Sequence, residues 1–189
     1  MTVDMSLPRC FGNKPGQEAY ALYHDTEWGV PVYEDRQLFE DLILEGAQAG
    51  LSYWTILQKR EGYRAAFHNF DVAKCAAMSD EELEAQVSNP AIVRHRLKVF
   101  SVRKNALAFL KIQEEFGSFS AYLWAYVDGT PVKRRPKTMA DLTVSDATSD
   151  ALSKDLKKRG MSFVGSTICY AYMQAVGLIN EHMADCHLA

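Results

Sequence analysis

Apolar residues recur at spacings of three and four along most of this chain, and alternation of apolar with polar residues is nearly absent. Spacings of three and four put side chains on one face of an α-helix, whereas a half-buried strand requires alternation. The pattern is longest over residues 95–116, where one face would carry Val99, Val102, Ala106, Phe109 and Leu110. The sequence therefore predicts an all-α fold.

Residues that cap helices mark where several of these helices begin. Asp35 is the predicted N-cap of one helix, and Ser52 is that of the next. Ser79 and Glu82 form the capping-box pattern at the start of a short helix that must end near Pro90. We also expect helices over residues 118–124, 149–159 and 166–179.

Length and composition are those of a globular protein. The chain has 189 residues, of which 48% are hydrophobic and 24% are charged, so disorder is excluded as its dominant state. No apolar run approaches the roughly 20 residues that span a bilayer, and the first residues lack the basic flank and apolar stretch of a secretory signal. We expect a single soluble, cytoplasmic domain over residues 1–189.

Charge is distributed unevenly along the chain. The formal net charge is −3, but residues 91–160 contain 14 Lys and Arg against 7 Asp and Glu. A nucleic-acid backbone responds to the local field of a protein and not to its net charge. This block is therefore a candidate docking face for DNA, with solvated helix faces as the alternative.

The segment 157–165 joins two of the predicted helices and begins with a basic triplet. Gly160 and Gly165 bracket a short turn, where glycine lets the backbone reach positive φ, and the apolar pair Phe163 and Val164 can pin the two helices together. The start of the second helix would then present backbone N–H groups to a phosphate. The alternative is a helical hairpin that only packs. The candidate phosphate contacts are Gly160, Phe163, Val164, Gly165, Ser166 and Thr167.

Two cysteines and two histidines near the chain ends suggest a metal site. His182 and Cys186 are four residues apart, so one helical turn would direct both at one point. Cys10 and His24 would have to join them in space, and spacing alone leaves open that the two pairs are unrelated. His187 is a competing ligand. Without a secretory signal we expect no disulfides.

An acidic residue stands among aromatic residues in the first third of the chain. Glu45 lies at helical spacing from Leu38 and Leu42, which places its carboxylate on the apolar side of a helix. An ionised carboxylate is costly to bury unless something pairs with it. The segment is therefore either a pocket for a flat, cationic ligand or a helix with a capped or salt-bridged buried Glu. The aromatic residues of the candidate pocket are Tyr23, Trp28 and Tyr53.

Five segments taken together are more specific than any one of them, and they resemble the bacterial 3-methyladenine DNA glycosylase I family. The resemblance runs from Cys10 to Cys186. The segments are Tyr-His-Asp-x-Glu-Trp-Gly-Val-Pro at 23–31, Leu-Glu-Gly-x-Gln-Ala-Gly-Leu-Ser at 44–52, Lys-Arg-x-x-Tyr-Arg at 59–64, Arg-His-Arg at 94–96, and Lys-Lys-Arg-Gly-x-x-Phe-Val-Gly-x-Thr-Ile-Cys-Tyr at 157–170.

The resemblance implies a helix-hairpin-helix DNA glycosylase fold with a zinc-tied lobe made from both chain ends. The hairpin region is expected at about 149–179. The resemblance assigns one structural Zn²⁺ to Cys10, His24, His182 and Cys186. It assigns base recognition and the catalytic role to Glu45, with Tyr23, Trp28 and Tyr53 around the base. Two positions depart from the family pattern. A Trp usually lies two residues after the first Cys, whereas this chain has only a shifted Phe11 directly after Cys10; and Tyr53, followed by Trp54, stands where Trp is usual.

The activity implied by the resemblance is DNA repair by base excision. The enzyme would hydrolyse the N-glycosidic bond of 3-methyladenine in double-stranded DNA, release the free base and leave an abasic site, without lyase activity. We expect a monomer with no membrane partner. Two alternatives explain fewer residues: a non-catalytic protein that binds damaged DNA through the hairpin, and a zinc enzyme with an open metal position.

Overall fold

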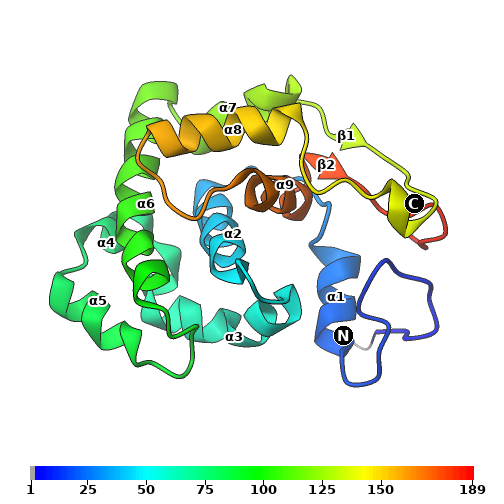
Figure 1. Cartoon of the computed structure of the whole chain (residues 1–189), viewed down its shortest axis with the longest axis horizontal. Coiled ribbons are helices and arrows are strands. Elements are labelled where there is room, and N and C mark those ends of the chain that lie inside the picture. Colours follow the sequence, from blue (N-terminus) through cyan, green and yellow to red (C-terminus); the bar gives the residue numbers. More distant parts are fainter. Residues whose placement is uncertain (1–2) are drawn as a thin grey trace.

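The computed structural model describes residues 3–189 and is mostly helical, as the periodicity predicts (Figure 1). The α-helices are α1 (Glu18–Thr26), α2 (Asp35–Gln48), α3 (Tyr53–Ala66), α4 (Val72–Ala77), α5 (Asp80–Val87), α6 (Arg96–Phe116), α7 (Phe119–Trp124), α8 (Ala147–Lys158) and α9 (Ser166–Ala175). Three single 3₁₀ turns are η1 (His68–Phe70), η2 (Ala125–Val127) and η3 (Met139–Asp141), and two short strands are β1 (Val132–Lys133) and β2 (Ile179–Asn180).

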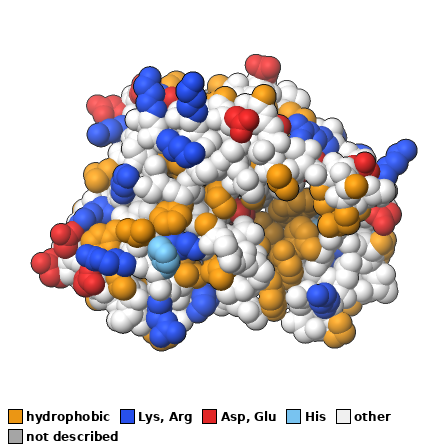
Figure 2. All heavy atoms as spheres, viewed as in Figure 1, with side chains coloured by type: hydrophobic (Ala, Val, Ile, Leu, Met, Phe, Trp, Pro, Cys, Tyr) orange, Lys and Arg blue, Asp and Glu red, His pale blue; other side chains and the backbone are white. Residues whose placement is uncertain are grey.

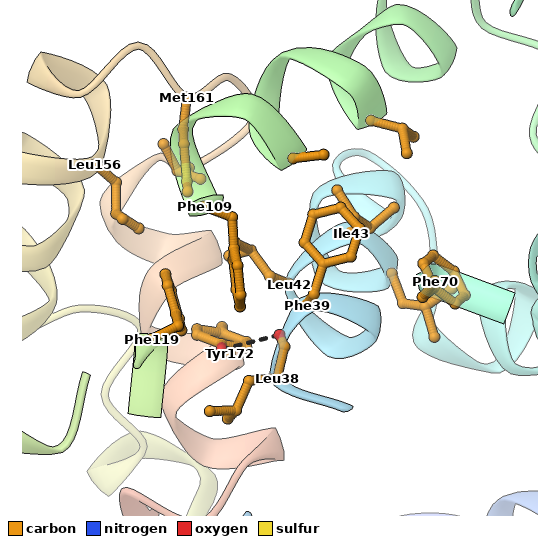
Figure 3. Close-up of a cluster of buried hydrophobic side chains, with 14 of the residues drawn as sticks. Leu38, Phe39, Leu42, Ile43, Phe70, Phe109, Phe119, Leu156, Met161 and Tyr172 are labelled. Atoms are coloured by element: carbon orange, nitrogen blue, oxygen red, sulfur yellow. Dashed lines mark hydrogen bonds between the residues drawn. The ribbon is translucent and has the colours of Figure 1, made fainter. Parts of the chain in front are cut away.

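Helix α2 lies at the centre of the molecule, packed against α3, α6, α7 and α9 (Figure 1). Every residue from Leu38 to Ala47 is buried, so this helix has no solvent face over that stretch. Figure 3 shows its apolar side chains meeting those of α6, α7 and α9, and the Tyr172 hydroxyl donates to the Leu38 carbonyl at 3.0 Å. Helix α2 therefore sets the positions of the helices around it.

Helix α6 confirms the predicted amphipathic pattern. Val99, Val102, Ala106 and Phe109 are buried, whereas Leu110 at the edge of the same face is half-buried. At the start of α6, the Lys98 ammonium donates to the carbonyls of the α2 C-terminus, those of residues 47 and 49, at 2.8 and 2.7 Å. A cation suits these unpaired carbonyls at the negative end of the helix dipole.

The predicted caps are confirmed at Ser52 and Ser79, but the prediction for Asp35 is wrong. Glu34 is the N-cap of α2, and its carboxylate accepts from the backbone N–H groups of residues 36 and 37. Asp35 instead accepts at 2.8 Å from the N–H groups of both Phe119 and Ser120, at the start of α7. Its carboxylate thus caps a helix that follows it by more than 80 residues, which local sequence does not reveal.

The last two helices have different bounds from those predicted. Helix α8 begins at Ala147, because Asp146 forms its capping box. Helix α9 ends at Ala175 and not at residue 179, since Gly177 takes a φ of +76° and turns the chain. The chain then enters β2, which pairs in parallel with β1 to give a two-stranded sheet absent from the sequence prediction.

The segment that begins at Val3 and the C-terminal segment lie on the same side of the molecule, next to α1 (Figure 1). The His187 N–H donates to the Pro8 carbonyl at 2.9 Å, and the buried Arg9 guanidinium bonds both oxygens of Asp25 on α1. The two terminal segments therefore form one lobe. Within residues 3–189 no helix is both long and apolar enough for a membrane span.

Candidate functional site

A cavity of about 220 Å³ lies where α1, α2, α3 and α9 meet. Figure 2 shows a hollow with hydrophobic walls in the region where Figure 1 shows α1, α2 and α9. The four pocket residues predicted from the sequence, Tyr23, Trp28, Glu45 and Tyr53, all line this cavity. Its remaining lining residues are Phe11, Tyr20, Gln48, Ala171 and Gln174.

Glu45 is the only acidic residue that lines the cavity among residues 3–189. The side chain is 3% exposed, and its Oε2 atom has no hydrogen-bond partner anywhere in that part of the chain. Burial, reinforced by the charge of Asp41, raises the pKa of Glu45 to about 8. The salt-bridged alternative considered for Glu45 is therefore wrong, because no cation pairs with its carboxylate.

Two other buried carboxylates on α2, unlike that of Glu45, have hydrogen-bond partners. Glu40 is fully buried and accepts from the guanidinium groups of Arg36 and Arg64, each at 2.8 Å. Asp41 accepts from the side-chain amide of Gln37, and burial raises the pKa of Asp41 to about 7. Glu45, one turn after Asp41, has neither kind of partner and remains available to a ligand.

Most residues that line the cavity are aromatic. The rings of Tyr23 and Tyr53 have centroids 4.7 Å apart, and Phe11 meets Trp28 edge-to-face at 5.1 Å. Phe11, the residue that departs from the family's usual Trp, thus forms part of the cavity wall. Trp54 does not line the cavity; its ring stacks on Tyr20 at 5.8 Å. The cavity is therefore shaped for a flat ring.

Sequence reasoning missed several lining residues for different reasons. Tyr20 and Gln48 lie three residues from Tyr23 and Glu45, so the one-turn spacing of a helix could have found both. Gln174 lies more than 120 residues from Glu45 in sequence, and no local pattern connects them. Only the packing of α9 against α2 brings Gln174 to the cavity.

The four predicted metal ligands meet in space. The ligand atoms of Cys10, His24, His182 and Cys186 all lie within 4.8 Å of one another. The Cys186 sulfur is 3.5 Å from the nearest ring nitrogen of each histidine, and the Cys10 sulfur is 3.7 Å from His182 Nδ1. Tetrahedral zinc with Zn–S of about 2.3 Å and Zn–N of about 2.0–2.1 Å separates S and N ligands by about 3.6 Å. The geometry therefore fits a zinc ion.

Asp25 organises the histidines around this group of four. Its Oδ1 atom lies 2.8 Å from His24 Nδ1, which leaves His24 Nε2 directed at the sulfur of Cys186. The same Oδ1 is 2.9 Å from His187 Nε2, so His187 pairs with Asp25 and lies outside the group of two sulfurs and two imidazoles. A carboxylate behind a ligating histidine is the usual support of such a site.

The cysteine and histidine group packs against two aromatic residues that line the cavity. The Trp28 ring packs edge-on against the ring of His182 at 4.8 Å, and Phe11 packs edge-on against His24 at 4.9 Å. Phe11 also follows Cys10 directly in the chain. Two walls of the cavity are therefore held by the same residues that would hold the metal.

Helices α8 and α9 form the predicted hairpin, with one correction to its backbone. Gly160 has a φ of +96°, as expected of the first glycine. Gly165 has a φ of −64°, and the second residue at positive φ is Phe163 at +57°. Phe163 packs closely over Gly46 of α2. A Cβ atom added at residue 46 would lie 3.2 Å from the Cβ atom of Phe163. Neither the backbone conformation nor crowding around a Cβ atom therefore requires glycine at 165 in the free protein.

The start of α9 offers unpaired backbone donors. Gly165 is its N-cap without a side-chain cap bond, and no backbone hydrogen bond within residues 3–189 uses the N–H groups of Ser166 or Thr167. Lys104 and Lys157 line a surface hollow of about 500 Å³ that also reaches Gly165. The hairpin therefore presents N–H donors beside lysines.

The basic block at 91–160 is less positive on the surface than its composition suggests. Arg96, Arg103 and Arg134 each pair with a single carboxylate, and Arg159 pairs with two. Within residues 3–189, no lysine of the block forms an ion pair with a carboxylate. Figure 2 shows Lys and Arg side chains gathered on the part of this face where Figure 1 shows α6 and the loop between α8 and α9.

Comparison with known proteins decides the family. The sequence profile of the methyladenine glycosylase family matches residues 13–189. The chain belongs to the methyladenine glycosylase family. The resemblance drawn from the five sequence segments is thereby confirmed.

Individual members of the methyladenine glycosylase family agree over nearly the whole chain. DNA-3-methyladenine glycosylase 1 of Escherichia coli (strain K12) is 48% identical over 167 residues, which cover 88% of this chain and 89% of that protein. A crystal structure of 3-methyladenine DNA glycosylase I superposes with a TM-score of 0.90 at 46% identity, covering 95% of this chain and 98% of the other. The structure of a variant of 3-methyladenine DNA glycosylase I in complex with 3-methyladenine superposes with a TM-score of 0.87 at 38% identity, with 92% of each chain covered.

The unpaired Glu45 makes a prediction about stability. Burial raises the pKa of the Glu45 carboxyl from 4.5 to about 8. The contribution of this carboxyl to the free energy of unfolding is therefore largest below pH 4.5 and is lost as the pH rises through 8. We therefore expect Glu45→Gln to raise the Tm at pH 8 by several degrees, at about 2–4 °C for each kcal/mol in a chain of this size. The gain should shrink towards pH 4.5. Thermal unfolding followed by circular dichroism measures both.

Glu40→Gln is the matched control for this stability measurement. It removes a carboxylate that two arginines bond, so its Tm should fall at pH 8. A lower Tm for Glu45→Gln at pH 8 would mean that an unseen partner stabilises the Glu45 carboxylate.

Proposed function

We propose that this protein hydrolyses the N-glycosidic bond of 3-methyladenine in alkylated DNA, releasing the base and leaving an abasic site for base excision repair. The proposal is supported by family membership and by relatives named DNA-3-methyladenine glycosylase. The observation that carries it is the buried Glu45 carboxyl, which lacks a partner in a cavity walled by aromatic rings. Such a site suits a flat ligand that carries positive charge.

The charge of the lesion explains why a single carboxylate suffices. Methylation at N3 makes the adenine base cationic, so it leaves the sugar as a neutral molecule and needs no strong general acid. Glycosidases that act on sugars use a pair of carboxylates for this purpose. Here Glu45 would bond the exocyclic amine edge of the base and complement its charge, and the rings of Tyr23, Trp28 and Tyr53 would stack on or wall the base.

Selectivity follows from the cost of ionising Glu45. The lesion must first leave the DNA stack, which costs a few kcal/mol and less for a damaged base. A cationic purine offsets the burial of the ionised carboxylate, whereas neutral adenine does not. No lysine lines the cavity among residues 3–189, so an amine nucleophile for lyase chemistry is missing from its walls. We infer a monofunctional glycosylase.

Base release from methylated DNA tests this function. We expect the wild-type protein to release free 3-methyladenine, detected by chromatography, and Glu45→Gln to lose about 100-fold or more in rate while remaining folded. Since the raised pKa of Glu45 is about 8, the wild-type rate should increase with pH towards 8, as the carboxyl ionises.

Asp41→Asn is the matched control, one turn earlier on the same helix and outside the cavity lining. Because the charge of Asp41 raises the pKa of Glu45, this variant should keep base release and shift the pH midpoint downwards. Rapid release of 3-methyladenine by folded Glu45→Gln would refute the role of Glu45.

We further propose that the α8–α9 hairpin is a helix-hairpin-helix unit that grips one DNA backbone. Support comes from the free N–H groups at the start of α9 and from Lys104 and Lys157 beside them. A helix N-terminus with adjacent cations favours phosphate without reading bases. The hairpin's contacts to α2, through Phe163 and Gly46, would place the bound backbone in a fixed relation to the cavity.

A charge placed at Gly165 tests the hairpin. Nothing lies within 4 Å of a Cβ at this position, so a side chain is accommodated in the free protein. We expect Gly165→Asp to weaken binding to abasic-site DNA about tenfold relative to Gly165→Asn, which has the same size without the charge. The difference in DNA affinity between the two variants should decrease as the salt concentration rises. Equal affinities of the two variants at low salt would argue against phosphate binding here.

We propose that Cys10, His24, His182 and Cys186 hold one structural zinc ion. The donor set and the S···N separations of 3.5–3.7 Å support this. Four protein ligands leave no coordination position for water, so the ion would tie the two chain ends together and hold the cavity wall. This argument disfavours a zinc enzyme with an open metal site. That the protein is a single-domain monomer in the cytoplasm stays a prediction.

Metal content and stability test the zinc site together. We expect about one zinc per chain in the wild type by elemental analysis. Cys186→Ala should lose the metal and lower the Tm by several degrees, since zinc binding contributes to folding. Cys75→Ala is the control, because Cys75 is buried far from the group and should keep the metal. Full zinc content in Cys186→Ala would contradict the assignment.

A further inference from the structure

The side chain of Gln174, which lines the cavity, is oriented by a hydrogen bond to Glu181, a residue that does not line the cavity. Its side-chain amide nitrogen donates to Glu181 Oε2 at 2.7 Å, and the Tyr170 hydroxyl donates to the same oxygen at 2.9 Å. The Arg134 guanidinium in turn donates to the Tyr170 hydroxyl at 2.7 Å. Glu181 is only 2% exposed, so the carboxylate that accepts from both Gln174 and Tyr170 is buried.

The chain of hydrogen bonds has a fixed direction. Arginine carries only donors, so the oxygen of Tyr170 accepts from Arg134, and its single O–H is left to donate to Glu181. Glu181 Oε2 therefore accepts from both of its neighbours. Gln174 must place its NH₂ group, and not its carbonyl, against that oxygen.

The orientation of the Gln174 amide decides what it offers to a ligand. With Nε2 held by Glu181, the carbonyl oxygen Oε1 takes the other of the two terminal positions of the planar amide group. Within residues 3–189 no hydrogen bond ends on this oxygen, and Gln174 lines the same cavity as Glu45. The α9 wall of the cavity thus carries a hydrogen-bond acceptor that cannot turn into a donor.

We propose that Gln174 is a specificity-determining residue that selects purines with an exocyclic amine and rejects those with a keto oxygen at the same position. The inference rests on the proposed glycosylase function and names the chemical group that its pocket reads. The amine of adenine has two N–H donors, one for Glu45 and one for Gln174 Oε1. Guanine presents O6 there, which is an acceptor. An acceptor facing a fixed acceptor in a small cavity leaves both unpaired.

Release of two methylated purines from the same DNA tests the proposal. DNA methylated at purine N3 contains both 3-methyladenine and 3-methylguanine, and chromatography measures the single-turnover release rate of each. The wild type should prefer 3-methyladenine. Gln174→Met keeps the length of the side chain without its acceptor, and we expect the ratio of the two rates to fall about fivefold or more.

Glu181→Gln tests the orientation by a second route. An amide at 181 can donate as well as accept, so Gln174 becomes free to turn its NH₂ group towards the cavity. The ratio of rates should fall in this variant too, with a gain in 3-methylguanine release. Because residue 181 adjoins His182, zinc content and Tm are measured alongside.

Tyr170→Phe is the matched control. It removes a hydroxyl from the same chain of hydrogen bonds but leaves Glu181 as a carboxylate that accepts from Gln174, so the ratio should stay within about twofold of the wild type. An unchanged ratio in folded Gln174→Met overturns the inference, and so does a loss in Tyr170→Phe as large as in Gln174→Met. A wild-type protein that releases neither base overturns the proposed function itself, whereas release without discrimination overturns only the role of Gln174.

Discussion

The structure depends on a helix that has no solvent face from Leu38 to Ala47 and still carries an unpaired carboxyl there. Helix α2 supplies the apolar side chains around which α3, α6, α7 and α9 pack, and it also carries Glu45 into the cavity. Burying a charge without a partner is unfavourable, and the protein responds by raising the pKa of that carboxyl. The rest of the core must therefore supply enough stability to hold this group where a ligand can use it.

The walls of the cavity come from segments that are distant in the chain. Phe11 and Trp28 lie near the N-terminus, and Gln174 lies near the C-terminus. Such walls keep their positions only if both ends of the chain are fixed. The cysteine and histidine group does this behind Phe11 and Trp28, and the hydrogen bonds of Glu181 do it behind Gln174. The same short stretch, residues 181–186, serves both purposes.

Sequence patterns failed where a side chain acts across a long sequence distance. Asp35 looks like a local cap but bonds the start of α7, and Gly165 looks like a turn glycine although Phe163 takes the positive φ. The basic block stays a predicted docking face, but its sequence did not reveal that several of its arginines are paired with carboxylates of other helices. In each case the residue type was informative, but its partner was set by packing.

The sequence by itself determined the helical class, most helix positions, the family, and the four aromatic and acidic residues of the pocket. These follow from periodicity, from caps and from short motifs, which act over one or two helical turns. Only the tertiary structure decided that Glu45 has no cation beside it, that the four predicted metal ligands converge, and that Gln174 lines the same cavity. The physical reason is that pairing, coordination and desolvation depend on distances between elements, and those distances are fixed only when the helices pack around α2.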